Sequence, residues 1–358
     1  MTEFHCPTKI YTGANALEAL RTFTARRVLV VTDSFFSKNG KALKLGRMIP
    51  NAQVEIFDKV TPDPEAALAA QGAALCRRFA PELLIALGGG SPMDCAKAIR
   101  LAYGEPLTFI AIPTTSGSGS EMTSFSILTH NAVKHPLVDP ALRPDAAILD
   151  ESLLRQLPSS LIADTGMDLF AHCLEALVAK NRSLCTDALA MLAAKTVLLN
   201  LEASFRGDVT VRGSIHEAAS MAGIAFDNAG LGVCHALAHA IGGAFHVPHG
   251  RLCAMLLPGV IAFHTEEGVG QYAELARFCG LTAATDRLAV RSLSMTITRL
   301  QRTLLLPQNL AQAGVSKEQW QEKEEQILQA ALLDPCCKTD PGTVTRQAIV
   351  EILRTVRP

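Results

Sequence analysis

Residues 83–100 read LLIALGGGSPMDCAKAIR, and this stretch decides how the first part of the chain folds. An apolar run with strand composition leads into the glycines Gly88 to Gly90 and then into a helix. Ser91 is a favourable N-cap, Pro92 suits the first helical position, and Asp94 stands three residues after the cap, as in a capping box. We therefore predict a strand, a tight turn and a helix capped by Ser91.

The glycines would let a ligand approach the backbone closely, and the free amides of a helix N-terminus form an anion site suited to a pyrophosphate. The pattern is neither GxGxxG nor a P-loop, and a tight turn with nothing bound would use the same residues. A second strand, 109–112, runs into the hydroxyl-rich loop PTTSGSGS at 113–120. Two strand ends that open into small loops define a crevice at the carboxyl edge of a parallel sheet, which favours a nucleotide site.

Asp33 follows another apolar strand, 27–32. An acid in this place can bind a ribose 2′-hydroxyl and repel a 2′-phosphate, which favours NAD over NADP. An ordinary turn aspartate would look the same in the sequence.

Continuous apolar strands separated by helices predict a parallel sheet covered on both faces. The strands are expected at 27–32, 53–57, 83–87, 109–112 and 146–149, with helices such as 15–24 and 64–79 between them. After residue 158 the chain shows only helical patterns, at 163–179, 185–200, 214–226, 234–245, 252–264, 285–304 and 317–332. We predict an α/β Rossmann-like dinucleotide-binding domain over 1–157 and an all-helical metal-binding and substrate domain over 158–358.

Composition excludes several classes of protein. The 358 residues carry 33 Lys plus Arg and 34 Asp plus Glu, a net charge of −1, which argues against a nucleic-acid binder or a polybasic membrane-surface protein. No run of 18 apolar residues and no basic, apolar leader occurs, so a cytoplasmic chain that does not bind a membrane is expected. The ten cysteines show no CxxC spacing, so they are expected to be reduced and mostly buried.

Acidic and histidine side chains recur at helical spacing in the second half. Asp168 and His172 stand at i, i+4, as do His235 and His239, and His246 and His249 follow at a turn. One carboxylate and three imidazoles form a sound set of ligands for a divalent first-row metal. A hydrogen-bonded core histidine, or a buried salt bridge of the aspartate, is the alternative for any one of them. Spacing alone does not choose among the four histidines after residue 234.

These segments together resemble the iron-containing (group III) alcohol dehydrogenase family. The matching stretches are GGGSPMDCAKAI (88–99), AIPTTSGSGSEMTS (111–124), ADTGMDLFAHCLEA (163–176) and AGLGVCHALAHAIGGAFHVPHG (229–250). The short N-terminus looks most like the 1-propanol dehydrogenases of bacterial microcompartments, and next like the alcohol dehydrogenases of ethanolamine utilisation. The resemblance implies the fold that this family shares with dehydroquinate synthase.

The resemblance also implies roles for particular residues. The metal, Fe²⁺ in most of the family, would be bound by Asp168, His172, His235 and His249, and His239 would be a proton donor near the substrate. Contacts to NAD(H) would come from Asp33, Gly89, Gly90, Ser91, Asp94, Thr114, Thr115, Ser118, Ile127 and Lys134. The substrate pocket would be lined by Phe125, Phe226, Leu231 and Cys336.

The implied reaction interconverts short-chain aldehydes, such as propanal and acetaldehyde, with primary alcohols. A homodimer or higher homo-oligomer is expected, formed by strand exchange near 9–12, together with microcompartment shell or cargo proteins as partners. Several positions depart from the family pattern and bear on substrate preference more than on chemistry: Asp63, Ser118, Arg251, Asp340 and Gly342.

Three alternatives stay open. A zinc-dependent polyol dehydrogenase, resembling glycerol dehydrogenase, would share the architecture, and affinity order favours Zn²⁺ over Fe²⁺. A lyase resembling dehydroquinate synthase would need several basic residues around a phosphate, and the region from Asp168 to His249 offers few. A non-catalytic nucleotide- or metal-binding component of an assembly would bind NADH without turnover.

Overall fold

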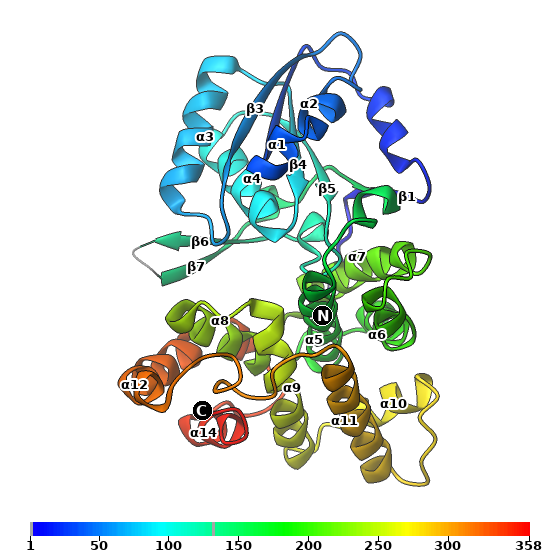
Figure 1. The fold of residues 1–358 in the computed structure, drawn as a ribbon, viewed down its shortest axis with the longest axis vertical. Helices are drawn as coiled ribbons and strands as arrows, with labels where there is room; N and C mark the ends of the chain where they lie inside the picture. The colour runs from blue at the N-terminus through cyan, green and yellow to red at the C-terminus, as the bar shows by residue number, and fades with distance from the viewer. Residues whose placement is uncertain (1–2, 131–132) are drawn as a thin grey trace. The chain divides into compact units, whose positions relative to one another are not determined.

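The computed structural model describes residues 3–130 and 133–358. The chain forms two compact units. One comprises residues 6–157, and the other comprises residues 158–358 together with residues 3–5. Each unit has its own architecture (Figure 1).

The first unit is built on a six-stranded parallel sheet with the order β1-β8-β5-β4-β2-β3. Its strands are β1 (Lys9–Thr12), β2 (Arg27–Asp33), β3 (Gln53–Val60), β4 (Leu83–Gly88), β5 (Thr108–Pro113) and β8 (Ala146–Leu149). All five predicted strands are present. The edge strand β1 completes the sheet by pairing with β8.

Helices cover both faces of this sheet, as the continuous apolar strands predicted (Figure 1). Leu29 and Val31 of β2 share one core with α3 (Ala66–Phe79) and α4 (Gly90–Tyr103). Val28 and Val30 face the other core, with η1 (Ala16–Thr22), α1 (Ser34–Lys38) and α2 (Lys41–Gly46). The chain leaves β2 toward β3 on one side and leaves β4 toward β5 on the other, so the strand order reverses between β2 and β4. In open α/β sheets, ligands bind at this switch point.

A separate antiparallel hairpin, β6 (Phe125–His130) and β7 (Val133–Val138), projects from this unit (Figure 1). The sequence did not predict it. Three short 3-10 turns occur in this part of the chain. The first, η2 (Ser120–Met122), precedes β6; η3 (Pro140–Leu142) lies between β7 and β8; and η4 (Glu151–Leu154) follows β8.

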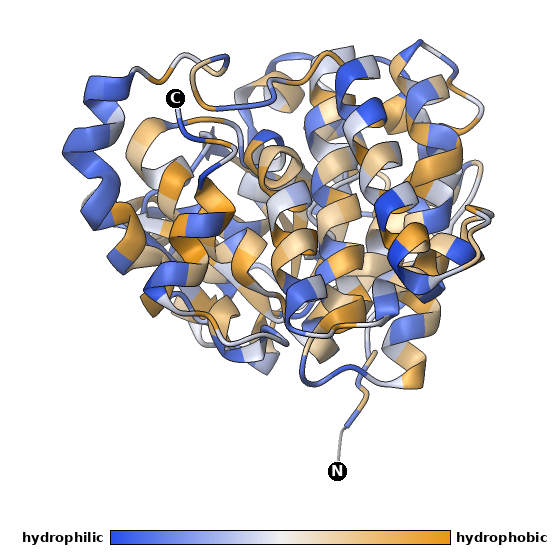
Figure 2. Ribbon diagram, turned by 90° about the horizontal axis from the view of Figure 1, so that it is seen from below, coloured by the Kyte–Doolittle hydropathy of each residue, from blue (hydrophilic) through white to orange (hydrophobic). Residues whose placement is uncertain are grey.

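The second unit is helical. Its helices are α5 (Ser159–Val178), α6 (Leu184–Phe205), α7 (Arg212–Ala229), α8 (Val233–Phe245), α9 (His249–Glu266), α10 (Gln271–Phe278), α11 (Asp286–Thr303), α12 (Lys317–Leu333), α13 (Cys336–Thr339) and α14 (Arg346–Leu353). Helix α5 is buried over most of its length and packs against α6, α7 and α9. Apolar and polar residues alternate along these helices (Figure 2). The predicted class, a parallel α/β part followed by a helical part, is confirmed; α10, α13 and α14 were not predicted.

Within the described residues, α6 is the one helix long and apolar enough to span a membrane. The sequence predicted this helix at 185–200 but not as a possible membrane span, because Asp187 and Lys195 interrupt the apolar run. Ala190, Ala193 and Val197 lie on a buried face of α6, and the helix packs against α5 and α7. A core helix passes the same test of length and composition.

Candidate metal centre and nucleotide-binding loops

Four metal-binding side chains converge in the helical unit. Asp168 comes from α5, His235 from α8, and His249 and Cys253 from the first turns of α9. One donor atom of each lies within 4.8 Å of the others. Oδ1 of Asp168 is 3.4 Å from Nε2 of His249 and 3.8 Å from Nε2 of His235.

The donor atoms of this cluster fit a cation. His235 is 1% exposed and Asp168 is 8% exposed. Within the described part of the chain, Nε2 of His235 and Oδ1 of Asp168 make no hydrogen bond, although both atoms are buried. Buried polar atoms without a partner are costly, and a metal ion would satisfy both atoms at once. Burial raises the pKa of the Asp168 carboxyl, but the charges of His172, His249 and His235 outweigh it, so this pKa lies below its usual range.

Glu175 fixes the orientation of His235. Its Oε2 is 2.5 Å from Nδ1 of His235, and its Oε1 accepts a hydrogen bond of 2.7 Å from the amide of Cys234. A proton on Nδ1 that is donated to Glu175 leaves the lone pair of Nε2 free for a metal, which is the usual outer-shell arrangement around a ligand histidine. Sequence reasoning missed Glu175, although Asp168, His172 and Glu175 stand at i, i+4 and i+7 on one face of α5.

His172, a predicted ligand, lies beside the four-residue cluster. Its ring stacks on His235 with centroids 4.4 Å apart and on Phe226 at 4.4 Å. Phe226, from α7, was predicted to line the substrate pocket, and its stacking places it next to His172, one of the candidate ligands. His246, which spacing left open, ends α8 as its exposed C-cap.

Close packing of α9 on α5 positions His249. A Cβ at Gly250 would lie 1.9 Å from the carbonyl oxygen of Asp164, so only glycine allows this approach. Arg251 donates to both carboxylate oxygens of Asp164, at 3.1 and 2.9 Å. This ion pair explains the arginine after His249-Gly250, where the family pattern is apolar, because it holds the start of α9 against α5.

His239 lies one turn after His235 and forms a pair with Asp334. Nδ1 of His239 is 2.9 Å from Oδ2 of Asp334, and the rings of His239 and His249 stack with centroids 5.2 Å apart. Burial raises the pKa of Asp334, but the hydrogen bond and charge of His239 outweigh it and hold this pKa below its usual value. Cys336, a predicted pocket residue, lies close to both.

A second carboxylate holds the N-terminus of α8. Asp340 is fully buried and accepts hydrogen bonds from the amides of Val233 (2.8 Å) and Gly342 (2.9 Å). His264 pairs with the same carboxylate at 3.1 Å, and its other ring nitrogen is 2.8 Å from the Tyr272 hydroxyl. Asp340, which departs from the family pattern, is thus part of a hydrogen-bond network that holds the start of α8. Leu231, another predicted pocket residue, accepts a hydrogen bond from Thr339 through its carbonyl oxygen.

In the α/β unit, the glycine-rich loop and the hydroxyl-rich loop face each other. A Cβ at Gly89 would lie 3.1 Å from Oγ1 of Thr115, and one at Gly90 would lie 3.6 Å from Cβ of Ser118. The amide of Thr114 donates to the carbonyl of Gly88 at 2.9 Å. Five of the predicted cofactor contacts are therefore brought together at the ends of β4 and β5.

The predicted N-cap was wrong. Helix α4 begins at Gly90, and its N-cap is Gly89, which provides no side-chain hydrogen bond. The helix starts before Ser91 because Gly89 takes the extended conformation that precedes the first turn. The first amides of α4 therefore have no side-chain cap, which is the open arrangement that an anion requires.

Asp94 contacts Ile127, another predicted cofactor residue, instead of closing a capping box. It accepts hydrogen bonds from the Ser120 hydroxyl at 3.2 Å and from the backbone of Ile127. Burial raises its pKa to about 6 against the opposing charge of Lys97. Lys134, on β7, forms an ion pair of 2.7 Å with Asp63, the position that departs from the family pattern.

Asp33 lies at the carboxyl end of β2, beside the switch point. Its Oδ1 accepts from the amides of Phe35 (2.9 Å) and Phe36 (3.2 Å), so it is also the N-cap of α1. Asp33 therefore has the local structural role that was the alternative to cofactor binding. Phe125, the last predicted pocket residue, begins β6 of this unit.

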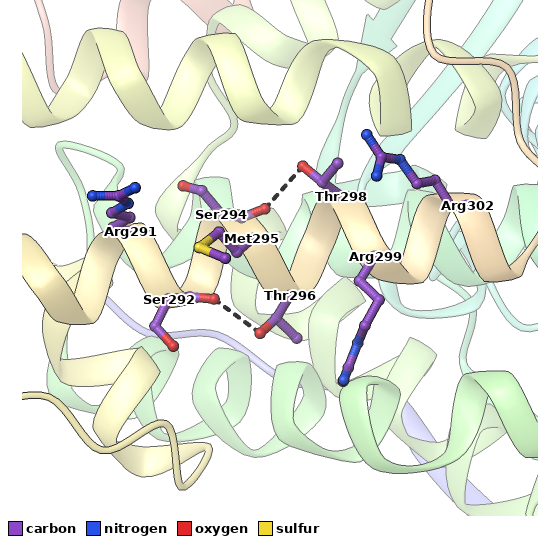
Figure 3. A pocket seen from close by; sticks show the side chains of 8 residues that line it. All are labelled: Arg291, Ser292, Ser294, Met295, Thr296, Thr298, Arg299 and Arg302. Carbon is purple, nitrogen blue, oxygen red and sulfur yellow. Dashed lines mark hydrogen bonds between the residues drawn. The ribbon is translucent and has the colours of Figure 1, made fainter.

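A surface groove of about 640 Å³ along α11 is the alternative location for a site (Figure 3). Its lining comes from one helix: Arg291, Ser292, Ser294, Met295, Thr296, Thr298, Arg299 and Arg302. The Thr296 and Thr298 hydroxyls bond to backbone carbonyls one turn earlier. Among the residues that the structure describes, no carboxylate, imidazole or thiol lines the groove, whereas the candidate metal cluster brings such groups together.

Comparison with known proteins identifies the family of the chain. Residues 7–151 match the family described as iron-containing alcohol dehydrogenase, and residues 162–356 match the Fe-containing alcohol dehydrogenase family, C-terminal. The chain belongs to the iron-containing alcohol dehydrogenase family. It is therefore an oxidoreductase, and its family implies a metal and a nicotinamide cofactor.

Relatives in this family align over essentially the whole chain. A 1-propanol dehydrogenase, PduQ, of Citrobacter freundii is 37% identical over 366 residues, covering 99% of each chain. An NADPH-dependent butanol dehydrogenase of Clostridium saccharobutylicum is 34% identical, covering 99% of this chain and 98% of that one. Among solved structures, the iron-containing alcohol dehydrogenase of Thermococcus thioreducens has a TM-score of 0.91 at 30% identity and 98% coverage of both chains. A 1,3-propanediol oxidoreductase also has a TM-score of 0.91, at 30% identity and 99% coverage of both.

Proposed function

We propose that this alcohol dehydrogenase interconverts short-chain aldehydes and primary alcohols with NAD(H), using Fe²⁺ held by Asp168, His172, His235 and His249. The proposal rests on two buried atoms, Nε2 of His235 and Oδ1 of Asp168, that make no hydrogen bond within the residues the structure describes. Both belong to a cluster of side chains that could hold a metal ion. When bound, the metal would act as a Lewis acid on the carbonyl oxygen, and the nicotinamide would carry the hydride.

The protein side chains then have distinct tasks. Glu175 holds His235 in the tautomer that presents Nε2 to the ion. The ring of Phe226, stacked on His172, shields one side of this ligand set with an apolar surface. With Leu231 and Cys336, it would line the pocket for an unbranched alkyl chain.

His239 is the residue that we assign to proton transfer. Its Nδ1 is engaged by Asp334, so the tautomer with the proton on Nδ1 leaves Nε2 available to exchange a proton with the substrate oxygen, directly or through water. Asp334 is a positioning residue in this scheme because it orients the ring.

NAD(H) would bind at the switch point of the α/β unit. The uncapped amides of α4, beside Gly89, Gly90 and Ser91, would hold the diphosphate. Thr114, Thr115 and Ser118 offer hydroxyls from the facing loop. Ile127 and Lys134, on the β6–β7 hairpin, would contact the same cofactor.

Asp33 sets the expected cofactor preference. Asp33→Asn keeps a good N-cap for α1 but removes the negative charge. We expect kcat/KM with NADPH to rise about tenfold relative to NADH, which corresponds to about 1.4 kcal/mol. The melting temperature should change little. Glu82→Gln, just before β4 at the opposite edge of the sheet, is the matched control and should leave the ratio unchanged. An unchanged ratio in Asp33→Asn would leave this residue only its capping role.

Substrate class separates the proposal from a zinc-dependent polyol dehydrogenase. We expect 1-propanol to be oxidised with NAD⁺ at a kcat/KM at least about tenfold above that for glycerol, because the residues proposed to line the pocket offer an apolar surface rather than hydroxyl partners. A preference for glycerol would overturn the substrate proposal. The lyase alternative loses support because Arg251, the basic residue next to His249, is engaged by Asp164.

The proposed assembly of this enzyme also starts from the family resemblance. Strand β1 is an edge strand, largely exposed, and such an edge can pair with a second copy of the chain. We propose a homodimer formed there. We also propose a cytoplasmic enzyme enclosed with microcompartment shell or cargo proteins, which rests on the resemblance alone.

A further inference from the structure

We propose that the thiolate of Cys253 is a ligand of the metal in this chain, so that the centre includes sulfur beside nitrogen and oxygen donors. The inference rests on the proposed metal centre and adds a residue to it. Cys253 is fully buried on α9, one turn after His249, at the i, i+4 spacing that presents two side chains to one ion.

The distances match those between ligands of one tetrahedral ion. Bond lengths of about 2.3 Å to sulfur and 2.0–2.1 Å to nitrogen or oxygen place sulfur and nitrogen about 3.5 Å apart, and nitrogen and oxygen about 3.3 Å apart. Sγ of Cys253 is 3.6 Å from Nε2 of His249, which is itself 3.4 Å from Oδ1 of Asp168. Both separations are those of neighbouring ligands.

A second observation points into the same space. Nε2 of His235 is buried and makes no hydrogen bond within the described residues, and it lies 3.8 Å from Oδ1 of Asp168. The four side chains with a donor atom within 4.8 Å of one another are Asp168, His235, His249 and Cys253. His172 stacks on His235 beside them, so the thiol would be a donor in addition to the proposed aspartate and histidines.

Cys234 shows by contrast what a structural cysteine does here. It is equally buried, yet its thiol points to the carbonyl oxygen of Cys253 at 3.7 Å and is absent from the donor set. When a divalent ion binds, the Cys253 thiol would lose its proton to solvent and form a metal–sulfur bond. No oxidation state changes in this step. Because thiolate is a soft ligand, we expect this donor to favour Zn²⁺ over Fe²⁺.

The test replaces the metal of the full-length enzyme with Co²⁺ under anaerobic conditions. Visible d–d bands report that the ion occupies the site, and a near-ultraviolet sulfur-to-cobalt charge-transfer band reports the Co–S bond. We expect both in the unmodified protein. Cys253→Ser should lose the charge-transfer band and keep the d–d bands, whereas the control Cys234→Ser should keep both.

X-ray absorption of the unmodified, zinc-loaded protein gives a readout that needs no variant. We expect one sulfur scatterer at about 2.3 Å. We also expect Cys253→Ser to lower Zn²⁺ affinity about 10–100-fold, a loss that even outer-shell substitutions reach, and to lower Fe²⁺ affinity less. Bound cobalt without a charge-transfer band, or zinc with only nitrogen and oxygen neighbours, would overturn the sulfur ligand while leaving the metal centre intact. Failure to bind any divalent metal would overturn the metal centre as well.

Discussion

His235→Ala is expected to abolish tight metal binding and to lower kcat by about 10³-fold or more. The side chain supplies one of the buried atoms that would bind the ion, and its loss also leaves Oε2 of Glu175 buried without its partner, Nδ1 of His235. A Lewis acid contributes several kcal/mol to the transition state, and each 1.36 kcal/mol is a factor of ten in rate. Metal content after gel filtration, measured beside single-turnover rates, checks both expectations.

His246→Asn is the matched control. His246 is exposed and ends α8 with a positive φ of 55°, a conformation that asparagine tolerates well. This variant should keep its metal and its rate. If His235→Ala bound metal as tightly as the unmodified protein, His235 would not be a ligand.

His239→Ala is expected to keep the metal and to lower kcat by about 10²–10³-fold, the usual contribution of a positioned general acid. The side chain is not among the four donors, and its Nδ1 is paired with Asp334. Added imidazole should restore part of the rate, which a purely structural role would not allow. Metal analysis and kcat, measured with and without imidazole, check this.

Asp334→Asn tests the positioning role separately. Asparagine can still accept a hydrogen bond from Nδ1, so we expect a smaller loss of kcat than in His239→Ala, with metal content unchanged. A His239→Ala variant with full kcat would remove His239 from proton transfer.

Much of the fold could be predicted from local patterns because buried parallel strands are continuous apolar runs. The apolar runs ending at Thr32 and Leu87 give two central strands, and helix composition after Ser159 gives the bundle. The β6–β7 hairpin could not be predicted because its strands mix polar and apolar residues, with Ser126, Thr129, Lys134 and His135 among them. The N-cap of α4 was predicted at Ser91 because serine is a favourable N-cap residue. The extended conformation of Gly89, which starts the helix earlier, is not visible in the sequence.

The site divides in the same way. Spacing found Asp168 with His172 and His235 with His239, because i, i+4 pairs are visible in one dimension. Cys253 has the same spacing from His249, so this signal was available. Asp334 lies 95 residues from its partner His239, and Asp340 lies 107 residues from Val233, whose amide donates to it, so only the tertiary packing of α8 reveals them.

The most direct test is anaerobic NADH oxidation with propanal, using metal-stripped protein to which Fe²⁺ or Zn²⁺ is added back separately. We predict no turnover without metal and restored turnover with Fe²⁺. Restoration by Zn²⁺ alone would correct the ion and leave the reaction unchanged. An undiminished rate in the metal-stripped enzyme would contradict the central claim that the cluster around Asp168 and His235 is a catalytic metal centre.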